Sequence, residues 1–101
     1  MQEASSAQRK ELRRLAHHLE PVVWIGKEGL SDDVVAATVD ALASHELIKI
    51  KLLALKDERK AVARDLADKA DCVLAGVIGH VVILYRENPD EEKRQIKLTA
   101  S

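Results

Sequence analysis

The order of apolar patterns along the chain is the feature that most restricts its possible folds. Helix-like spacing covers residues 6–18, 32–44 and 57–70, and strand-like runs cover 22–25, 47–53, 73–78 and 81–85. Strands that alternate with helices are typical of βαβ units, whose right-handed crossovers put both connecting helices on one side of the sheet. We therefore predict an α/β fold, a single open-faced sandwich in the order α-β-α-β-α-β-β with a mixed four-stranded sheet.

A few residues mark where these elements begin and end. Pro21 should stop the first helix. The other side of the sheet is expected either to stay open or to be covered in part by this first helix. Ser31 and Asp57 are the expected N-caps of the second and third helices. Gly79-His80 predicts a hairpin turn, and residues 95–98 are expected to add a short edge strand.

Length and cysteine content restrict the class of protein. The 101 residues suffice for one domain with one core. Cys72 is the single cysteine, so it can form no internal disulfide, and we expect it buried at a helix end. The first residues do not resemble a signal peptide, and no apolar stretch approaches the ~20 residues of a membrane span. We expect a cytoplasmic protein that does not enter a membrane.

The charge balance argues against a globally basic surface. Sixteen basic and seventeen acidic residues give a net charge of −1, whereas nucleic-acid modules are usually basic. An RNA-binding surface would therefore be a local patch. Trp24 and Tyr85 are the only aromatic residues, and Trp24 is expected in the core, with a stacking platform as the alternative. Base stacking on an aromatic platform is thus not expected, and recognition should use phosphates and shape.

Gly26-Lys27-Glu28-Gly29 lies between a predicted strand and a predicted helix. Two glycines allow a tight turn and a close approach of a ligand, and Lys27 supplies a positive charge. The amides of the next helix N-terminus point toward the same place. The GxxG loop of KH-type modules clamps a nucleotide backbone with the same parts. The alternative is an ordinary connection between a strand and a helix.

Further cations fall on the predicted sheet. Lys49 and Lys51 share one strand face, and Arg86 ends the last strand. With Lys27 they are expected to combine into a patch. The alternative is an ordinary solvated strand face.

The first helix carries a basic run formed by Arg9, Lys10, Arg13, Arg14 and His17. Spacings of three and four residues predict a continuous stripe along the helix, which can lie on a phosphate backbone. A solvated helix face explains the run equally well.

Catalytic and metal-binding patterns are absent from the sequence. The four histidines lack the spacing of metal ligands: His17, His18, His45 and His80. His45-Glu46 is expected to be a C-capping pair, and Gly76-Val77-Ile78-Gly79, a second GxxG, lies within a predicted strand. We expect that the protein is not an enzyme and that it binds no metal, cofactor or small-molecule substrate.

Five segments together resemble the CRM domain family, most closely its stand-alone bacterial YhbY-like form. They are Leu12 to His17, Gly26 to Leu30, His45 to Lys51, Val77 to Gly79, and Leu84 to Arg86. The resemblance covers residues 8–98. It implies an RNA-binding protein associated with precursors of the large ribosomal subunit, and a fold similar to the C-terminal domain of translation initiation factor three. Gly76 and His80 depart from the residues most frequent in the family, glutamine and lysine.

The sequence thus predicts a monomeric protein that binds structured ribosomal RNA. The expected RNA-binding residues are Gly26, Lys27, Glu28, Gly29, Lys49, Lys51, Arg86, Arg9, Lys10, Arg13, Arg14 and His17. Two other readings stay open. One is a protein-interaction adaptor that uses the acidic segment 90–92, and the other is a small enzyme with His17 or His45 as a base.

Overall fold

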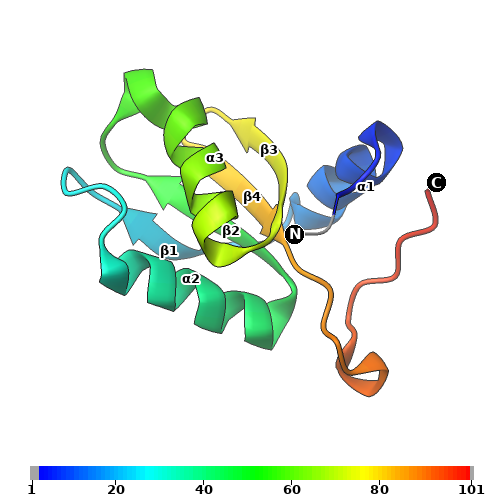
Figure 1. Cartoon of the computed structure of the whole chain (residues 1–101). Coiled ribbons are helices and arrows are strands. Elements are labelled where there is room, and N and C mark those ends of the chain that lie inside the picture. The colour runs from blue at the N-terminus through cyan, green and yellow to red at the C-terminus, as the bar shows by residue number, and fades with distance from the viewer. Residues whose placement is uncertain (1–2, 101) are drawn as a thin grey trace.

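A mixed four-stranded sheet forms the centre of the computed structural model, which describes residues 3–100 (Figure 1). The strands are β1 (Pro21–Ile25), β2 (Leu47–Leu52), β3 (Val73–Ile78) and β4 (Val81–Tyr85), in the spatial order β1-β2-β4-β3. β1 runs parallel to β2, whereas β4 is antiparallel to both β2 and β3. This confirms the predicted mixed sheet.

Helices α2 (Asp32–His45) and α3 (Arg59–Ala70) cover one face of the sheet, as the right-handed crossover rule predicts (Figure 1). Alternate residues of β2 point into the core between them. Ile48, Ile50 and Leu52 are almost completely buried with Leu42 of α2 and Leu66 of α3. Burial of this apolar face is the main force that holds the two helices on the sheet.

Helix α1 (Ser6–Ala16) lies on the opposite face, where it packs mainly against β3. Its buried residues Leu12 and Ala16 form a second, smaller core with strand residues that include Ile83 and Tyr85. The helix begins with a capping box between Ser5 and Gln8. It ends two residues before the predicted boundary at 18, because the chain turns at the C-cap after Ala16 toward Pro21.

The predicted N-cap at Asp57 is wrong. A 3-10 turn, η1 (Lys56–Glu58), follows Leu55, whose φ of 64° is left-handed. The N–H of Glu58 donates to the carbonyl of Leu55 at 3.1 Å, so Asp57 lies inside this turn and α3 begins only at Arg59. The short turn takes the place at which a capped helix was expected.

The predicted edge strand at residues 95–98 is also wrong. After β4 the chain forms a short 3-10 turn, η2 (Glu91–Lys93), and then a tail that runs back along α1 (Figure 1). The tail amides donate to carboxylates in place of strand partners. Glu46 accepts from Asn88 at 2.6 Å, Gln95 at 2.5 Å and Ile96 at 2.9 Å, and Glu11 accepts from Thr99 at 3.0 Å and Ala100 at 2.9 Å.

Other predictions at element ends are confirmed. Gly79, with φ +57°, turns the chain between β3 and β4. Cys72 is buried directly after α3, and this burial raises the pKa of its thiol to about 12.

Within residues 3–100, no helix is both long enough and apolar enough to cross a membrane.

Candidate nucleic-acid interface

The glycine loop connects the end of β1 to the start of α2. The N–H of Gly29 donates to the carbonyl of Gly26 at 3.1 Å, and Gly29 has a φ of +71°, which favours glycine. A Cβ added at Gly26 would meet no atom within 4 Å. The fold therefore requires the conformational freedom of Gly29, whereas Gly26 leaves open space beside the backbone.

The N-terminus of α2 is less suited to an anion than the sequence suggested. Ser31 caps the helix as predicted, since its Oγ accepts from the N–H of Val34 at 3.2 Å. The first turn, however, carries the exposed carboxylates of Asp32 and Asp33. Acids there interact favourably with the helix dipole and compete with a phosphate for the same positive end. A phosphate at the loop would need cations from outside α2.

Those cations lie on the face of the sheet that α1 partly covers. Lys49 and Lys51 share this face with Leu47, which packs in the smaller core. Lys51 is exposed and pairs with Trp24 on β1 and with Val81 on β4. The Nζ of Lys49 donates instead to the carbonyl of His17, at 3.0 Å, directly after α1. Lys51 is therefore the strand cation closer to the glycine loop and the more available one.

Arg13 borders the same face from α1. Its guanidinium donates to the carbonyl of Ala75 at 2.8 Å, and its side chain packs over Gly76. A Cβ at Gly76 would lie 2.6 Å from the Cδ of Arg13, so this glycine makes room for the arginine. Gly76 lies inside β3, as expected for a GxxG pattern without a binding loop. The contact between Arg13 and Gly76 was missed from the sequence.

Arg86 is the predicted site residue that the structure separates from the glycine loop. Because β4 runs antiparallel to β2, its last residues lie at the opposite end of the sheet (Figure 1). There the Nε of Arg86 donates to the carbonyl of Asp71 at 3.1 Å, and its guanidinium also donates to the carbonyl of Ala70. Arg86 thus caps the C-terminus of α3, and the prediction that it joins Lys27 in one patch is wrong.

Two arginines of the basic run on α1 donate to backbone carbonyls. Arg9 donates to the carbonyl of Ala4 near the start of the helix, and Arg14 lies 3.8 Å from Glu11. Lys10 and Arg14 flank the end of the tail, while Arg13 lies on the sheet. The hydrogen bonds from the N–H of Ala100 and the hydroxyl of Thr99 hold the pKa of Glu11 below its usual range. Arg9 and Arg13 are therefore held within the protein, whereas Lys10, Arg14 and His17 stay exposed at spacings of four and three residues.

Trp24 was predicted to lie in the core, and this is wrong. Its side chain is 52% exposed on the edge strand β1, on the face opposite α2 and α3. The reason is that α1 packs mainly on β3 and only weakly, if at all, on the edge strand β1. Ile78, 57% exposed, lies at the other edge of the same uncovered row.

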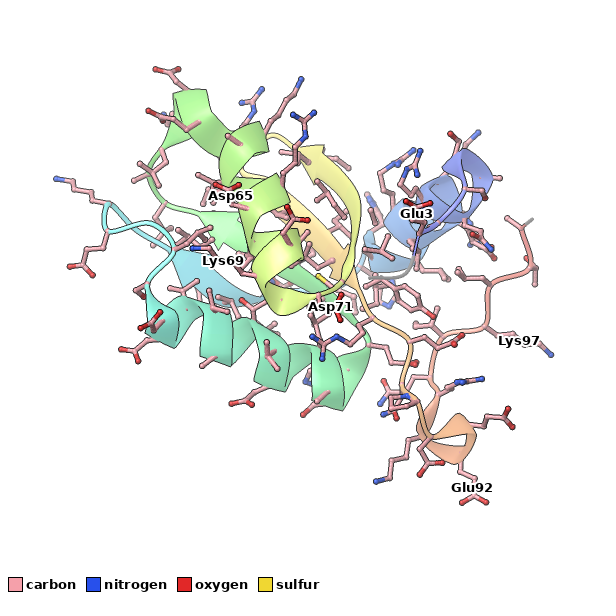
Figure 2. The ribbon with its side chains drawn as sticks, in the orientation of Figure 1. Glu3, Asp65, Lys69, Asp71, Glu92 and Lys97 are labelled. Atoms are coloured by element: carbon pink, nitrogen blue, oxygen red, sulfur yellow. The ribbon has the colours of Figure 1, made fainter. Side chains whose placement is uncertain are left out.

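The acidic segment lies away from the glycine loop. Figure 1 places η2 and the β1–α2 loop at opposite ends of the molecule, and Figure 2 shows Glu92 projecting outward from this turn. Glu46, expected to cap α2 with His45, is the C-cap residue, and its buried side chain also holds the tail. Among residues 3–100, no group of three His, Cys, Asp or Glu side chains is arranged to hold a metal ion.

Comparison with known proteins places the chain in a family. Residues 5–86 match the CRS1 / YhbY (CRM) domain. The chain belongs to this family. A probable RNA-binding protein of Pseudomonas aeruginosa is 39% identical to the CRM chain over 87 residues, which are 85% of this chain and 84% of that protein. An RNA-binding protein of Haemophilus influenzae is 37% identical, over 89% of this chain and 90% of its own.

A solved structure supports the same fold. The solution structure of a hypothetical protein from Staphylococcus aureus matches the CRM chain with a TM-score of 0.79 and 31% sequence identity. The match covers 92% of this chain and 98% of the other. The three helices and the mixed sheet are therefore shared with a solved protein.

Proposed function

We propose that this CRM protein binds structured RNA, with phosphates at the glycine loop and along the part of the sheet that α1 leaves uncovered. The observation that carries the proposal is the position of Lys51, an exposed cation on the strand beside β1, at the end of the sheet from which the loop emerges. Gly26 leaves space for a close approach of a backbone, and Lys27 adds a second exposed cation. The names of the relatives as RNA-binding proteins support the same function.

The RNA is proposed to be ribosomal, in precursors of the large subunit. This part of the proposal rests on the resemblance to the stand-alone bacterial CRM proteins. Phosphate and shape recognition suits a folded RNA, since neutralisation of phosphates carries most of the affinity without sequence information. Crosslinking in cells, followed by sequencing of the attached RNA, tests it. Ribosomal RNA should dominate the reads, and a dominance of messenger or transfer RNA would redirect the assignment.

Lys27→Glu is the direct test of RNA binding by the loop. The exposed side chain has no part in the core, so the thermal unfolding temperature should stay within about 2 °C of the wild type. Affinity for structured RNA should fall by more than about tenfold, because the change removes a cation and adds an anion beside a phosphate. Glu28→Gln is the matched control, which should bind as well as the wild type or better. Equal affinity of the wild type and Lys27→Glu would remove the loop from the site.

A protein-interaction adaptor is the competing function. It would use the exposed acids of η2, which project away from the sheet (Figure 2). Filter binding of RNA by the purified protein over a range of salt concentrations separates the two functions. An RNA-binding protein should bind RNA with an affinity that falls as salt rises, whereas an adaptor should show no specific RNA binding at any salt concentration.

A further inference from the structure

Trp24, Lys51, Val81 and Ile78 form one row across the end of the sheet nearest to the glycine loop. Trp24 pairs with Lys51, Lys51 with Val81, and Val81 with Ile78, so their side chains lie on one face. We call these four residues the open row. Its two large edge residues are both more than half exposed. Lys51 and the half-buried Val81 lie between these two edge residues, so Trp24 is an exposed ring with a cation as its direct neighbour.

The next row of the sheet toward α1, formed by Lys49, Ile83 and Gly76, is covered by side chains. There Lys49 donates to the carbonyl of His17, and Arg13 packs over Gly76, the cross-strand partner of Ile83. α1 and its cations therefore form a border along one side of the open row. The glycine loop borders the other side, because Gly26 follows Trp24 by two residues, about 7 Å of chain at most.

The distribution of charge directs a bound backbone toward the open row. On the α2 side of the loop, Asp32 and Asp33 repel a phosphate. On the sheet side, Lys51 lies beside Trp24. Lys49 and Arg13 lie in the next row of the sheet, toward α1. A phosphate chain that contacts Gly26 is therefore drawn over the sheet face. The exposed ring of Trp24 is then within reach of a base attached to that chain.

We propose that the open row is a nucleobase platform, on which an unpaired base of the RNA stacks against Trp24 while Lys51 neutralises an adjacent phosphate. This proposal rests on the proposed RNA-binding function and adds the class of RNA that the site prefers, one with unpaired nucleotides next to a helix. An indole ring stacks with any base, because every base has a π-face, so the platform carries little sequence preference. The flanking lysine suits a nucleic acid better than an apolar protein partner, since desolvating an unpaired ammonium is costly.

The chain supplies its own probe, because Trp24 is the single tryptophan. Tryptophan fluorescence should be followed during titration with a short RNA hairpin that has an unpaired loop, and with a fully paired RNA duplex of equal length. The hairpin should quench the emission of Trp24 with the same midpoint as filter binding. The duplex, which offers no free base, should bind with much less quenching.

Variants of the open row complete the test. Trp24→Leu should weaken hairpin binding by about tenfold and duplex binding by less than twofold, whereas Trp24→Phe should keep most of the affinity. Ile78→Ala, at the far edge of the row, is the apolar control and should have a smaller effect than Trp24→Leu. Because Trp24 lies outside both cores, thermal unfolding of each variant should resemble that of the wild type.

The outcomes separate the two proposals. Unquenched emission with equal hairpin affinity for the wild type and Trp24→Leu would overturn the platform, and continued sensitivity to Lys27→Glu would then leave RNA binding by the loop intact. A dimer that depends on Trp24 in sedimentation velocity, with hairpin affinity unchanged in Trp24→Leu, would assign the row to a second copy of this chain. Failure of the wild type to bind either RNA would overturn both proposals.

Discussion

The two ends of the sheet use charged residues in opposite ways. At the end with the glycine loop, Lys27 and Lys51 are exposed, and neither forms an ion pair with any residue between 3 and 100. At the other end, the buried carboxylate of Glu46 binds three tail amides, and Arg86 binds the last carbonyls of α3. The same kinds of side chain therefore hold the fold at one end and remain available to a ligand at the other.

A chain with a net charge of −1 can therefore keep two lysines exposed and without an ion pair at one end of its described structure. Five of its seventeen acids hold the tail or lie at η2, namely Glu11, Glu46, Asp90, Glu91 and Glu92, whereas Glu28, Asp32 and Asp33 are exposed at the loop. Exposed charges more than about 8 Å apart are largely screened at physiological salt. Under the proposed function, the affinity for RNA should therefore depend more on the charges near the open row and the loop than on the net charge.

The largest effect on stability is expected from Glu46→Ala. Loss of the buried carboxylate leaves the amides of Asn88, Gln95 and Ile96 without their acceptor, so the free energy of unfolding should fall by about 3 kcal/mol. Urea unfolding measures this fall, and hydrogen exchange should show faster exchange of the three amides. Glu91→Ala is the control, because its ion pair with Arg94 is 3.9 Å long and exposed, and it should cost less than about 0.5 kcal/mol.

The affinity of Glu46→Ala for RNA should change less than twofold at a temperature where the protein is folded, since the tail lies at the opposite end from the loop. A large loss of RNA affinity in the folded variant would break the division between the two ends. Continued protection of the tail amides would show that Glu46 does not hold the tail.

The largest effect on RNA affinity in this set is expected from the double variant Lys49→Ala/Lys51→Ala. The double variant should weaken RNA binding about tenfold and make the slope of log affinity against log salt shallower by about 1 to 2. Lys51→Ala alone should account for most of this change, because the ammonium of Lys49 is hydrogen bonded to the carbonyl of His17. Filter binding over a range of salt concentrations measures both quantities.

Lys97→Ala is the matched control, since Lys97 is exposed on the tail (Figure 2). Its salt slope should equal that of the wild type. An equal loss of slope in Lys97→Ala and Lys51→Ala would mean that RNA covers both ends of the molecule.

A pair of glycine variants should give opposite results. Gly29→Ala should lower the free energy of unfolding by about 1 kcal/mol, because its φ of +71° is strained for alanine. Gly26→Ala should leave stability unchanged or slightly higher, since its Cβ would meet open space, but it should weaken RNA binding by filling that space. Thermal unfolding and filter binding run on both variants check this. Wild-type affinity in Gly26→Ala would show that no RNA backbone approaches there.

The smallest effect on RNA affinity is expected when the acidic segment 90–92 is neutralised. Replacing Asp90, Glu91 and Glu92 by Asn, Gln and Gln should change RNA affinity less than twofold at ~0.15 M salt, because screening isolates η2 from the loop. Filter binding at that salt measures the ratio. A large gain in affinity would place the segment over the RNA surface and favour its role as a docking site.

Much of the fold could be predicted from local patterns. The order of the helices and strands, the cap at Ser31 and the turn at Gly79 follow from periodicity and from backbone preference. Both depend on neighbours in the sequence alone. The predicted strand at 95–98 failed because extended residues can satisfy their amides with side chains as well as with a ladder, and Glu46 is about 50 residues away along the chain.

The candidate site was only partly predictable for the same reason. The loop residues Gly26 to Gly29 are contiguous, so sequence alone identified them as one feature, and strand alternation put Lys49 and Lys51 on one face. Whether a face is covered depends instead on which strands α1 crosses. That packing exposed Trp24, which looked like a core residue, and the antiparallel course of β4 carried Arg86 to the other end of the sheet. Local sequence determines the helices, the strands and which residues share a face. The burial of a side chain and the partners of a charged group depend instead on contacts between distant segments, which only the tertiary structure brings together.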